Sequence, residues 1–216
     1  MAKTEVAVDP IDVHREVAAL RLSLDVIHRA LENGYVRRTF CTPNSPIATP
    51  GTESWRGTIE ELRNQLIVIA GEWRRADVEG LPVVVNDAHK IVVAVMTGDD
   101  ATGSLHRKVK PKNRKGTVVK MCTVENGGQA DMFGYVPERQ APRDFQGYDF
   151  WILLQRTADG GVYSELSRPT VYSDKSKKIV DWSKRIIIPP VLPHERATVT
   201  PDAPTDDLDF ELKKIA

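Results

Sequence analysis

Two adjacent carboxylates, Asp99 and Asp100, come closest in residue type and spacing to a catalytic site. They follow an apolar run and precede Gly103, so we expect them at the end of a β-strand. The two carboxylates would supply oxygen ligands for Mg²⁺ in a nuclease, beside a basic side chain such as Lys120 on a neighbouring strand. The compact Glu-x-Lys pattern that such nucleases carry does not follow this pair closely. Gly98-Asp99-Asp100 is also typical of a turn, so a magnesium nuclease is an alternative function and not the preferred one.

Other nucleophiles and metal ligands are scattered along the 216 residues. The five histidines include no His-x-x-x-His pair, and no Gly-rich phosphate-binding loop occurs. The two cysteines, Cys41 and Cys122, are too far apart in sequence to indicate a disulfide framework or a zinc site, and they suit a reducing compartment. We see neither the apolar run of a signal peptide nor a membrane-spanning stretch. We therefore predict a cytoplasmic, non-enzymatic protein without a metal or cofactor.

Charge is distributed unevenly, although the totals cancel. With 30 basic and 30 acidic side chains, bulk charge alone would not hold this protein on nucleic acid. Residues 201–216 contain five acids ahead of two lysines, whereas residues 107–120 contain seven cations and no acid. These seven cations are Arg107, Lys108, Lys110, Lys112, Arg114, Lys115 and Lys120.

The basic segment, residues 107–120, is predicted to form a protruding loop or hairpin, because Pro111 and Gly116 interrupt it. Such a loop would follow the phosphate backbone of DNA, with an affinity that falls steeply as salt rises. No pattern in it specifies contacts with base edges. The alternative is a solvated loop without a ligand. The acidic residues 201–216 would mimic DNA or cover the basic segment, and a further alternative function is a protein-binding inhibitor that acts through this tail.

A short polar-then-apolar peptide follows the basic segment, between Gly127-Gly128 and Gly134. Its sequence is Gln129-Ala130-Asp131-Met132-Phe133. It resembles the pentapeptide, roughly Gln-Leu-(Ser/Asp)-Leu-Phe, by which many bacterial DNA-processing proteins dock on the sliding clamp of the replicative polymerase. The resemblance implies that Gln129 forms hydrogen bonds at the rim of the clamp pocket, while Met132 and Phe133 enter its apolar interior. Ala130 departs from the usual leucine, which would weaken docking by about 1 to 2 kcal/mol. The alternative is that Met132 and Phe133 pack this loop onto the protein's own sheet.

The chain as a whole resembles a family of uncharacterised proteins found on bacterial mobile elements and phage-like islands. Three short sequences carry the resemblance: a Glu-Leu-Arg helix, a Thr-Gly-Asp turn and a Tyr-Asp-Phe-Trp strand. The resemblance implies a bacterial, cytosolic setting. It implies no activity and no catalytic residue.

Two helices are expected near the N-terminus. Asp9-Pro10 is a good helix start, and apolar residues at spacings of three and four predict a helix over 10–33 that Gly34 ends. Residues 41–54 are predicted to be a loop. Thr58 and Glu61 have the spacing of a capping box, which predicts a second helix over 58–73.

Strands are expected after Gly80, where β-branched residues become frequent. The runs at 82–85 and 91–97 predict a hairpin, and Asp159-Gly160-Gly161 predicts a tight turn. Further strands are predicted at 117–124, 148–156, 162–168, 170–172 and 184–188.

These elements predict an α+β fold in which two N-terminal helices pack on one face of a mostly antiparallel β-meander. The single domain is expected at 9–192, between a flexible N-terminus at 1–8 and a mobile, proline-bearing acidic tail at 193–216. The preferred function is a non-enzymatic accessory or adaptor protein in bacterial DNA replication, repair or mobile-element maintenance. It would contact DNA through the basic segment. The predicted sliding-clamp contacts are Gln129, Asp131, Met132 and Phe133.

Overall fold

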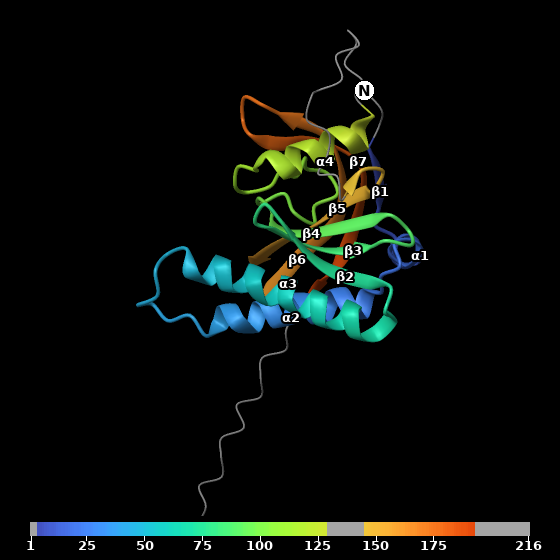
Figure 1. The fold of residues 1–216 in the computed structure, drawn as a ribbon. Coiled ribbons are helices and arrows are strands. Elements are labelled where there is room, and N and C mark those ends of the chain that lie inside the picture. Colours follow the sequence, from blue (N-terminus) through green and yellow to red (C-terminus); the bar gives the residue numbers. More distant parts are fainter. Residues whose placement is uncertain (1–3, 129–144, 193–216) are drawn as a thin grey trace, which may run out of the picture.

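A computed structural model describes residues 4–128 and 145–192, which contain a seven-stranded sheet and four helices. The helices are α1 (Pro10–Ala19), α2 (Leu24–Thr39), α3 (Thr49–Ala70) and α4 (Thr117–Gly127). The strands are β1 (Glu5–Ala7), β2 (Trp73–Val78), β3 (Leu81–Asn86), β4 (Ile91–Thr97), β5 (Asp149–Ala158), β6 (Gly161–Ser173) and β7 (Lys178–Val191). Figure 1 shows the long α2 and α3 running side by side along one face of the sheet.

The sheet has the strand order β1-β7-β6-β5-β4-β3-β2. Neighbouring strands are antiparallel except for the parallel pairs β1–β7 and β4–β5. This confirms the prediction of an α+β fold with N-terminal helices packed on a mostly antiparallel sheet. Because β4 and β5 are parallel, the chain between them must cross from one end of the sheet to the other, and this crossover contains the basic segment and α4.

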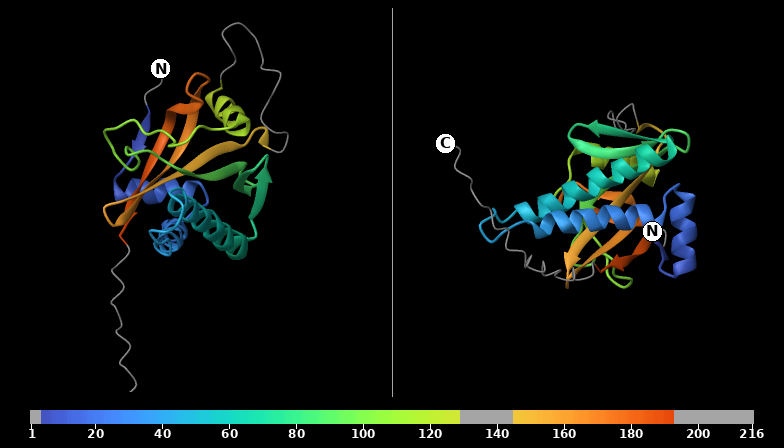
Figure 2. Two further views of the ribbon diagram at one scale, coloured as in Figure 1. Left: turned by 90° about the vertical axis from the view of Figure 1, so that its left-hand side faces the viewer. Right: turned by 90° about the horizontal axis from the view of Figure 1, so that it is seen from below.

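Helices cover both faces of the sheet, which explains why the central strands are continuous apolar runs. In β4, Val93 and Val95 belong to the core shared with α1, α2 and α3. Val92 and Ala94 belong to the core shared with α4 and with the chain that follows β4. The views in Figure 2 place α4 and the α2–α3 pair on opposite sides of the sheet. The prediction had helices on one face alone.

The helix predicted over 10–33 is in fact two helices. Asp9 caps α1 as predicted, and its side chain accepts a hydrogen bond from the N–H of Ile11 at 3.0 Å. The chain then turns through Arg21, which has a φ of 57°, and Ser23 caps α2 by accepting from the N–H of Val26. The apolar spacing continues through the turn because Leu22, like the helices on either side, packs into the same core.

Gly34 lies inside α2, and it permits a close crossing with α3 rather than ending the helix. A Cβ atom at Gly34 would collide with the Thr58 hydroxyl and would lie 2.5 Å from the carbonyl oxygen of Ser54. Thr58 is also not the predicted helix cap, since α3 begins at Thr49. Its buried hydroxyl lies 2.8 Å from Oε1 of Gln155 on β5 and so joins α3 to the sheet.

Residues 117–124 form helix α4 and not the predicted strand. The β-branched residues of this segment favour a strand by propensity. However, its buried residues Val118, Val119, Cys122 and Thr123 recur with helical spacing and cover one face of the sheet. Tertiary packing therefore overrides the local preference.

The remaining differences concern the edges of the sheet. Residues 5–7, predicted to be flexible, form β1 and pair with β7, and β2 was not predicted. The predicted strands 162–168 and 170–172 are parts of the single strand β6. The hairpins are as expected: β3 pairs with β4, and Asp159 and Gly160 turn between β5 and β6 with φ angles of 50° and 74°.

The crossing of α2 and α3 gives a prediction for stability. We expect Gly34→Ala to lower the free energy of unfolding by about 2 to 3 kcal/mol, because backbone on α3 cannot move away from the new methyl group. Gly51→Ala is the matched control, since no atom lies within 4 Å of a Cβ there and the backbone conformation suits alanine. Urea denaturation should separate the two variants, and equal midpoints would contradict this account of the crossing.

Candidate functional site

Strands β3 and β4 separate at one end of the sheet, where the sequence places a proline. Their pairing stops at Val83 opposite Ala94. The next residue in that register is Pro82 opposite Val95, and proline has no N–H to donate to a neighbouring strand. The indole N–H of Trp55 on α3 donates to the carbonyl oxygen of Val95 instead, at 2.9 Å. A side chain from the helical layer thus takes the place of a strand partner.

A cleft of about 900 Å³ lies at this fork. One wall comes from the end of α2 and the start of α3, a second from the β2–β3 turn and the adjoining strand ends, and a third from residues 112–119. The apolar part of its lining includes Trp55, Leu81, Pro82, Val95 and Met96. Val95 and Met96 are only 2% and 4% exposed because they are packed in the protein's own cores, whereas Trp55, Leu81 and Pro82 are partly exposed and form the accessible apolar wall.

Cations dominate the charged lining of the cleft. Arg38 lies at the end of α2, while Lys112, Arg114 and Lys115 belong to the basic segment. Glu79, in the β2–β3 turn, is the acid of the lining. Within residues 4–128 and 145–192, none of the four cationic side chains forms an ion pair or a hydrogen bond with another side chain. Among the described residues, the positive rim of the cleft is therefore not neutralised.

Burial affects the charge of one of these cations. Lys115 is half-buried, and desolvation together with the neighbouring charge of Lys178 lowers the pKa of its ammonium group to about 8. This ammonium group is mostly protonated at pH 7, but no ion-pair partner among the described residues offsets the free-energy cost of its desolvation. An anion placed beside Lys115 would relieve that cost.

The basic segment is fastened to the sheet and does not protrude freely as predicted. The N–H of Lys112 donates to the carbonyl oxygen of Thr97 at 2.9 Å, at the end of β4. Lys178 on β7 donates from Nζ to the carbonyl oxygen of Lys112 at 2.8 Å. The hydroxyl of Tyr172 on β6 donates to the carbonyl oxygen of Lys115, also at 2.8 Å. These contacts fix the backbone and leave the cationic side chains of Lys112 and Lys115 for a ligand.

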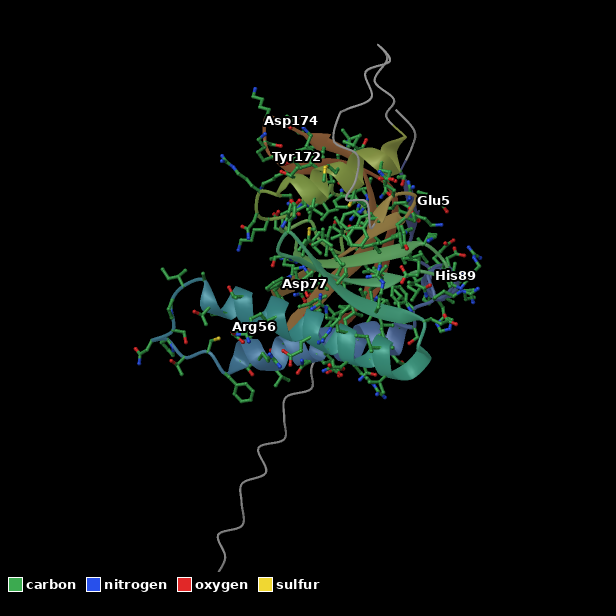
Figure 3. All side chains as sticks on the ribbon, in the orientation of Figure 1. Glu5, Arg56, Asp77, His89, Tyr172 and Asp174 are labelled. Carbon is green, nitrogen blue, oxygen red and sulfur yellow. The ribbon has the colours of Figure 1, made fainter. Side chains whose placement is uncertain are left out.

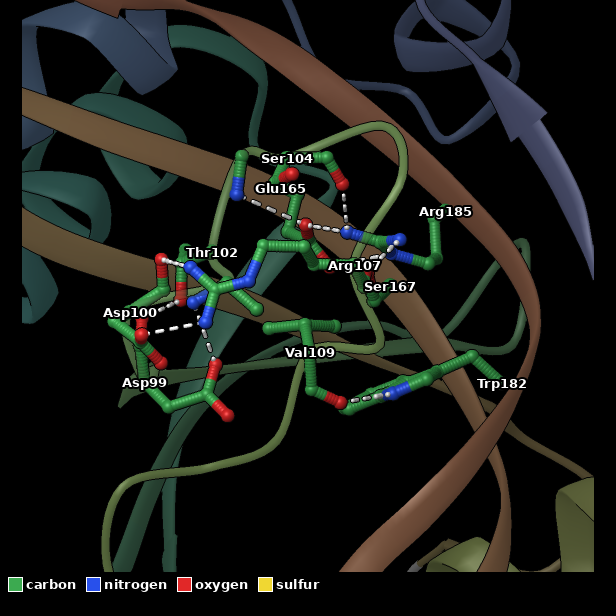
Figure 4. A network of polar contacts seen from close by, with 12 residues as sticks. Asp99, Asp100, Thr102, Ser104, Arg107, Val109, Glu165, Ser167, Trp182 and Arg185 are labelled. Carbon is green, nitrogen blue, oxygen red and sulfur yellow. Dashed lines mark hydrogen bonds and ion pairs between the residues drawn. The ribbon is translucent and has the colours of Figure 1, made fainter.

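A buried ion pair anchors the chain that leads into the basic segment (Figure 4). Arg185 on β7 and Glu165 on β6 form two hydrogen bonds, of 3.0 and 2.5 Å, and their side chains are 6% and 0% exposed. Glu165 also accepts from the N–H of Gly103 at 3.1 Å. Arg185 also donates to the carbonyl oxygens of Ser104 and Arg107, at 3.0 and 3.1 Å. The loop after β4 is therefore held to the sheet through its backbone.

Helix α4 starts directly after Lys115 and contributes further positive potential. Its N-cap is Gly116, which has no side chain to accept from the first N–H groups of the helix. Residues Gly116, Thr117, Val118 and Val119 line the cleft. The positive end of the helix dipole thus lies beside the cationic rim.

Two of the seven predicted DNA-contacting cations are already paired. Arg107 contacts the carboxylate of Asp100 at 2.5 Å, and Lys120 contacts that of Asp174 at 2.7 Å. These contacts lower the pKa of both carboxyl groups. Figure 3 shows Asp174 and Tyr172 at the far end of the β6–β7 hairpin, beside α4.

The other five predicted cations divide into two groups. Lys112, Arg114 and Lys115 line the cleft, whereas Lys108 and Lys110 are exposed outside it. Sequence reasoning missed the contributions of Arg38 and Trp55. Arg38 has only Arg37 as a neighbouring cation, and Trp55 stands apart from other aromatic residues, so no local signal identified them.

The carboxylates of the alternative nuclease are engaged in local structure. Asp99 accepts from the N–H of Ala101 at 3.1 Å, as in a turn, and Asp100 pairs with Arg107. Among the described residues, no three His, Cys, Asp or Glu side chains lie close enough to hold a metal ion. Burial raises the pKa of Cys122 to about 12, so this thiol is not a nucleophile at neutral pH.

Two sequence predictions lie outside the described residues. These are the clamp-like peptide, Gln129 to Phe133, and the acidic residues 201–216. The first described range ends at Gly128, the C-cap of α4, which directly precedes the peptide in sequence.

Comparison of the chain with protein-family models, with curated proteins and with solved structures found no match. None of the helices in the described residues has the length and apolar character needed to cross a membrane.

The buried ion pair yields a second stability prediction. Glu165→Gln leaves Arg185 without its counter-charge in a site that excludes water, so we expect a loss of roughly 3 to 5 kcal/mol in the free energy of unfolding. Asp77→Asn is the matched control, because Asp77 pairs with Arg63 at an exposed position where such pairs contribute about 1 kcal/mol or less. Chemical denaturation measures both changes. Similar small losses would show that the buried pair does not anchor the loop.

Proposed function

We propose that this protein is a non-enzymatic accessory or adaptor protein that binds nucleic acid, acting in bacterial DNA replication, repair or mobile-element maintenance. The observation that carries the proposal is the set of four cationic side chains around one cleft, Arg38, Lys112, Arg114 and Lys115, none of which has an acidic partner in the described chain. Such a set fits a phosphate backbone, because each neutralised phosphate releases a condensed counterion.

The overall charge of zero is compatible with this proposal. Two acidic residues near the basic segment, Asp100 and Asp174, are occupied by their contacts with Arg107 and Lys120. Glu79 is the acid of the cleft lining, against four cations there. Binding of this kind positions the protein on a strand without reading its sequence, which suits an accessory factor.

Removing two of the cations should weaken binding and reduce its dependence on salt. For Lys112→Gln/Arg114→Gln we expect the dissociation constant for a labelled DNA oligonucleotide to rise roughly tenfold at low salt. The slope of log affinity against log salt should fall by about 1.4 to 1.8, since two phosphate contacts are lost. Fluorescence anisotropy across a salt series measures both quantities.

The matched control is Arg21→Gln/Arg75→Gln, which removes two exposed arginines outside the cleft. This control should bind DNA as the wild type does. Equal weakening by both double variants would indicate a diffuse charge effect, and no binding by the wild type would end the proposal.

Docking on the sliding clamp is the second part of the proposal, and the sequence alone supports it. The peptide Gln129 to Phe133 resembles the clamp-binding pentapeptide, and it follows the basic segment closely enough to place a protein on both clamp and DNA. Met132→Ala/Phe133→Ala should abolish binding to purified bacterial clamp while leaving DNA affinity unchanged. Surface plasmon resonance tests this, and equal clamp binding by wild type and variant would remove this part.

A further inference from the structure

We propose that the cleft at the β3–β4 fork binds an unpaired nucleotide of a single-stranded nucleic acid, with its base against the apolar wall and its phosphates on the cationic rim. This inference rests on the proposed function and deepens it, because it names the form of nucleic acid that the site selects. It is carried by the combination of an apolar interior and a positive rim within one cleft.

The interior suits a flat, weakly polar ring. The partly exposed side chains of Trp55, Leu81 and Pro82 line the cleft, and the hydrogen bond from the Trp55 indole to the Val95 carbonyl oxygen fixes the indole ring before a ligand arrives. Every base has a π-face that packs on aromatic and apolar side chains, a contact worth about 1 to 3 kcal/mol per base. A double helix keeps its bases paired and stacked, so it would leave this wall unused.

The size of the cleft fits this occupant. About 900 Å³ falls within the range of roughly 300 to 1,000 Å³ that pockets for organic ligands span. A single nucleotide and its flanking phosphates are ligands of this scale.

The positions of the cations favour a strand over a free mononucleotide. Arg38 reaches the cleft from the helical layer on one face of the sheet, whereas Lys112, Arg114 and Lys115 come from the crossover on the other face. A nucleotide within a strand carries a phosphate on each side of its sugar and can contact both groups. A mononucleotide has a phosphate at one end only, so it would leave either Arg38 or the three cations of the crossover without a phosphate partner.

Two glycines allow the cleft to be filled without disturbing the fold. Gly116 and Gly51 line different walls of the cleft, neither has a positive φ, and no atom lies within 4 Å of a Cβ at either position. The Cβ of a phenylalanine at either position would therefore meet no protein atom, and the added ring would narrow the cleft that both positions line. Asn64, on the exposed face of α3 and outside the cleft lining, provides the matched control Asn64→Phe.

The experiment compares these variants of the full-length protein with fluorescence-labelled single-stranded and double-stranded DNA of one sequence. We expect wild-type protein to bind the single strand at least tenfold more tightly than the duplex. Gly116→Phe and Gly51→Phe should each lower single-strand affinity about tenfold, while duplex affinity and the Asn64→Phe control stay unchanged. Circular dichroism melting of each variant verifies that it is folded. A deoxynucleoside monophosphate should compete with the oligonucleotide only weakly.

Three other outcomes would contradict the inference or the proposed function. If single strand and duplex bind equally, or if both filled variants bind the single strand normally, the unpaired-nucleotide inference is wrong while the proposed nucleic-acid function stands. If the monophosphate competes as strongly as the oligonucleotide, the site takes free nucleotides, and the inference of a strand is overturned. If the protein binds neither the single strand nor the duplex, the proposed nucleic-acid function is wrong, and the inference that rests on it is wrong as well.

Discussion

The contact between Glu165 and Arg185 determines where the chain on the second face of the sheet can lie. Neither charge would be tolerated alone in a site with almost no solvent exposure, because an uncompensated buried charge is strongly destabilising. Their remaining hydrogen-bonding groups are satisfied by backbone atoms of the loop after β4, including Gly103 and Ser104. The ion pair thus fixes the position of the loop, and the loop backbone supplies hydrogen-bond partners to both charged side chains. The basic segment that follows therefore starts from a fixed point.

The cleft itself arises from an interruption of regular structure. A strand pair that continued past Ala94 would have closed the fork, but Pro82 cannot extend the ladder and Trp55 occupies the open carbonyl group. The crossover between the parallel strands β4 and β5 then brings cations to this fork from the opposite face. Apolar wall and charged rim thus come from parts of the chain that are far apart in sequence.

Features that depend on residues close together in the chain could be predicted from the sequence, whereas features that depend on tertiary contacts could not. The Asp9 cap, the β3–β4 hairpin and the turn at Asp159 were predictable because each is decided by residues close together in the chain. Helix α4 was not, because its valines favour a strand until a sheet exists for one helical face to cover. The basic segment was visible as a run of charge, but only the fold shows which of its cations are already paired and that Arg38 joins the others.

The pairing of β1 with β7 has a consequence for how this protein matures on the ribosome. Glu5 lies opposite Lys184, so β1 receives its partner only after β7, the last described strand in chain order, has emerged. Contacts between such distant parts of a chain form late and slow the search for the native state. Until then the nascent polypeptide exposes an unfinished sheet edge along β6, the kind of surface that chaperones protect during translation. The described sheet should therefore be completed only after β7 has emerged.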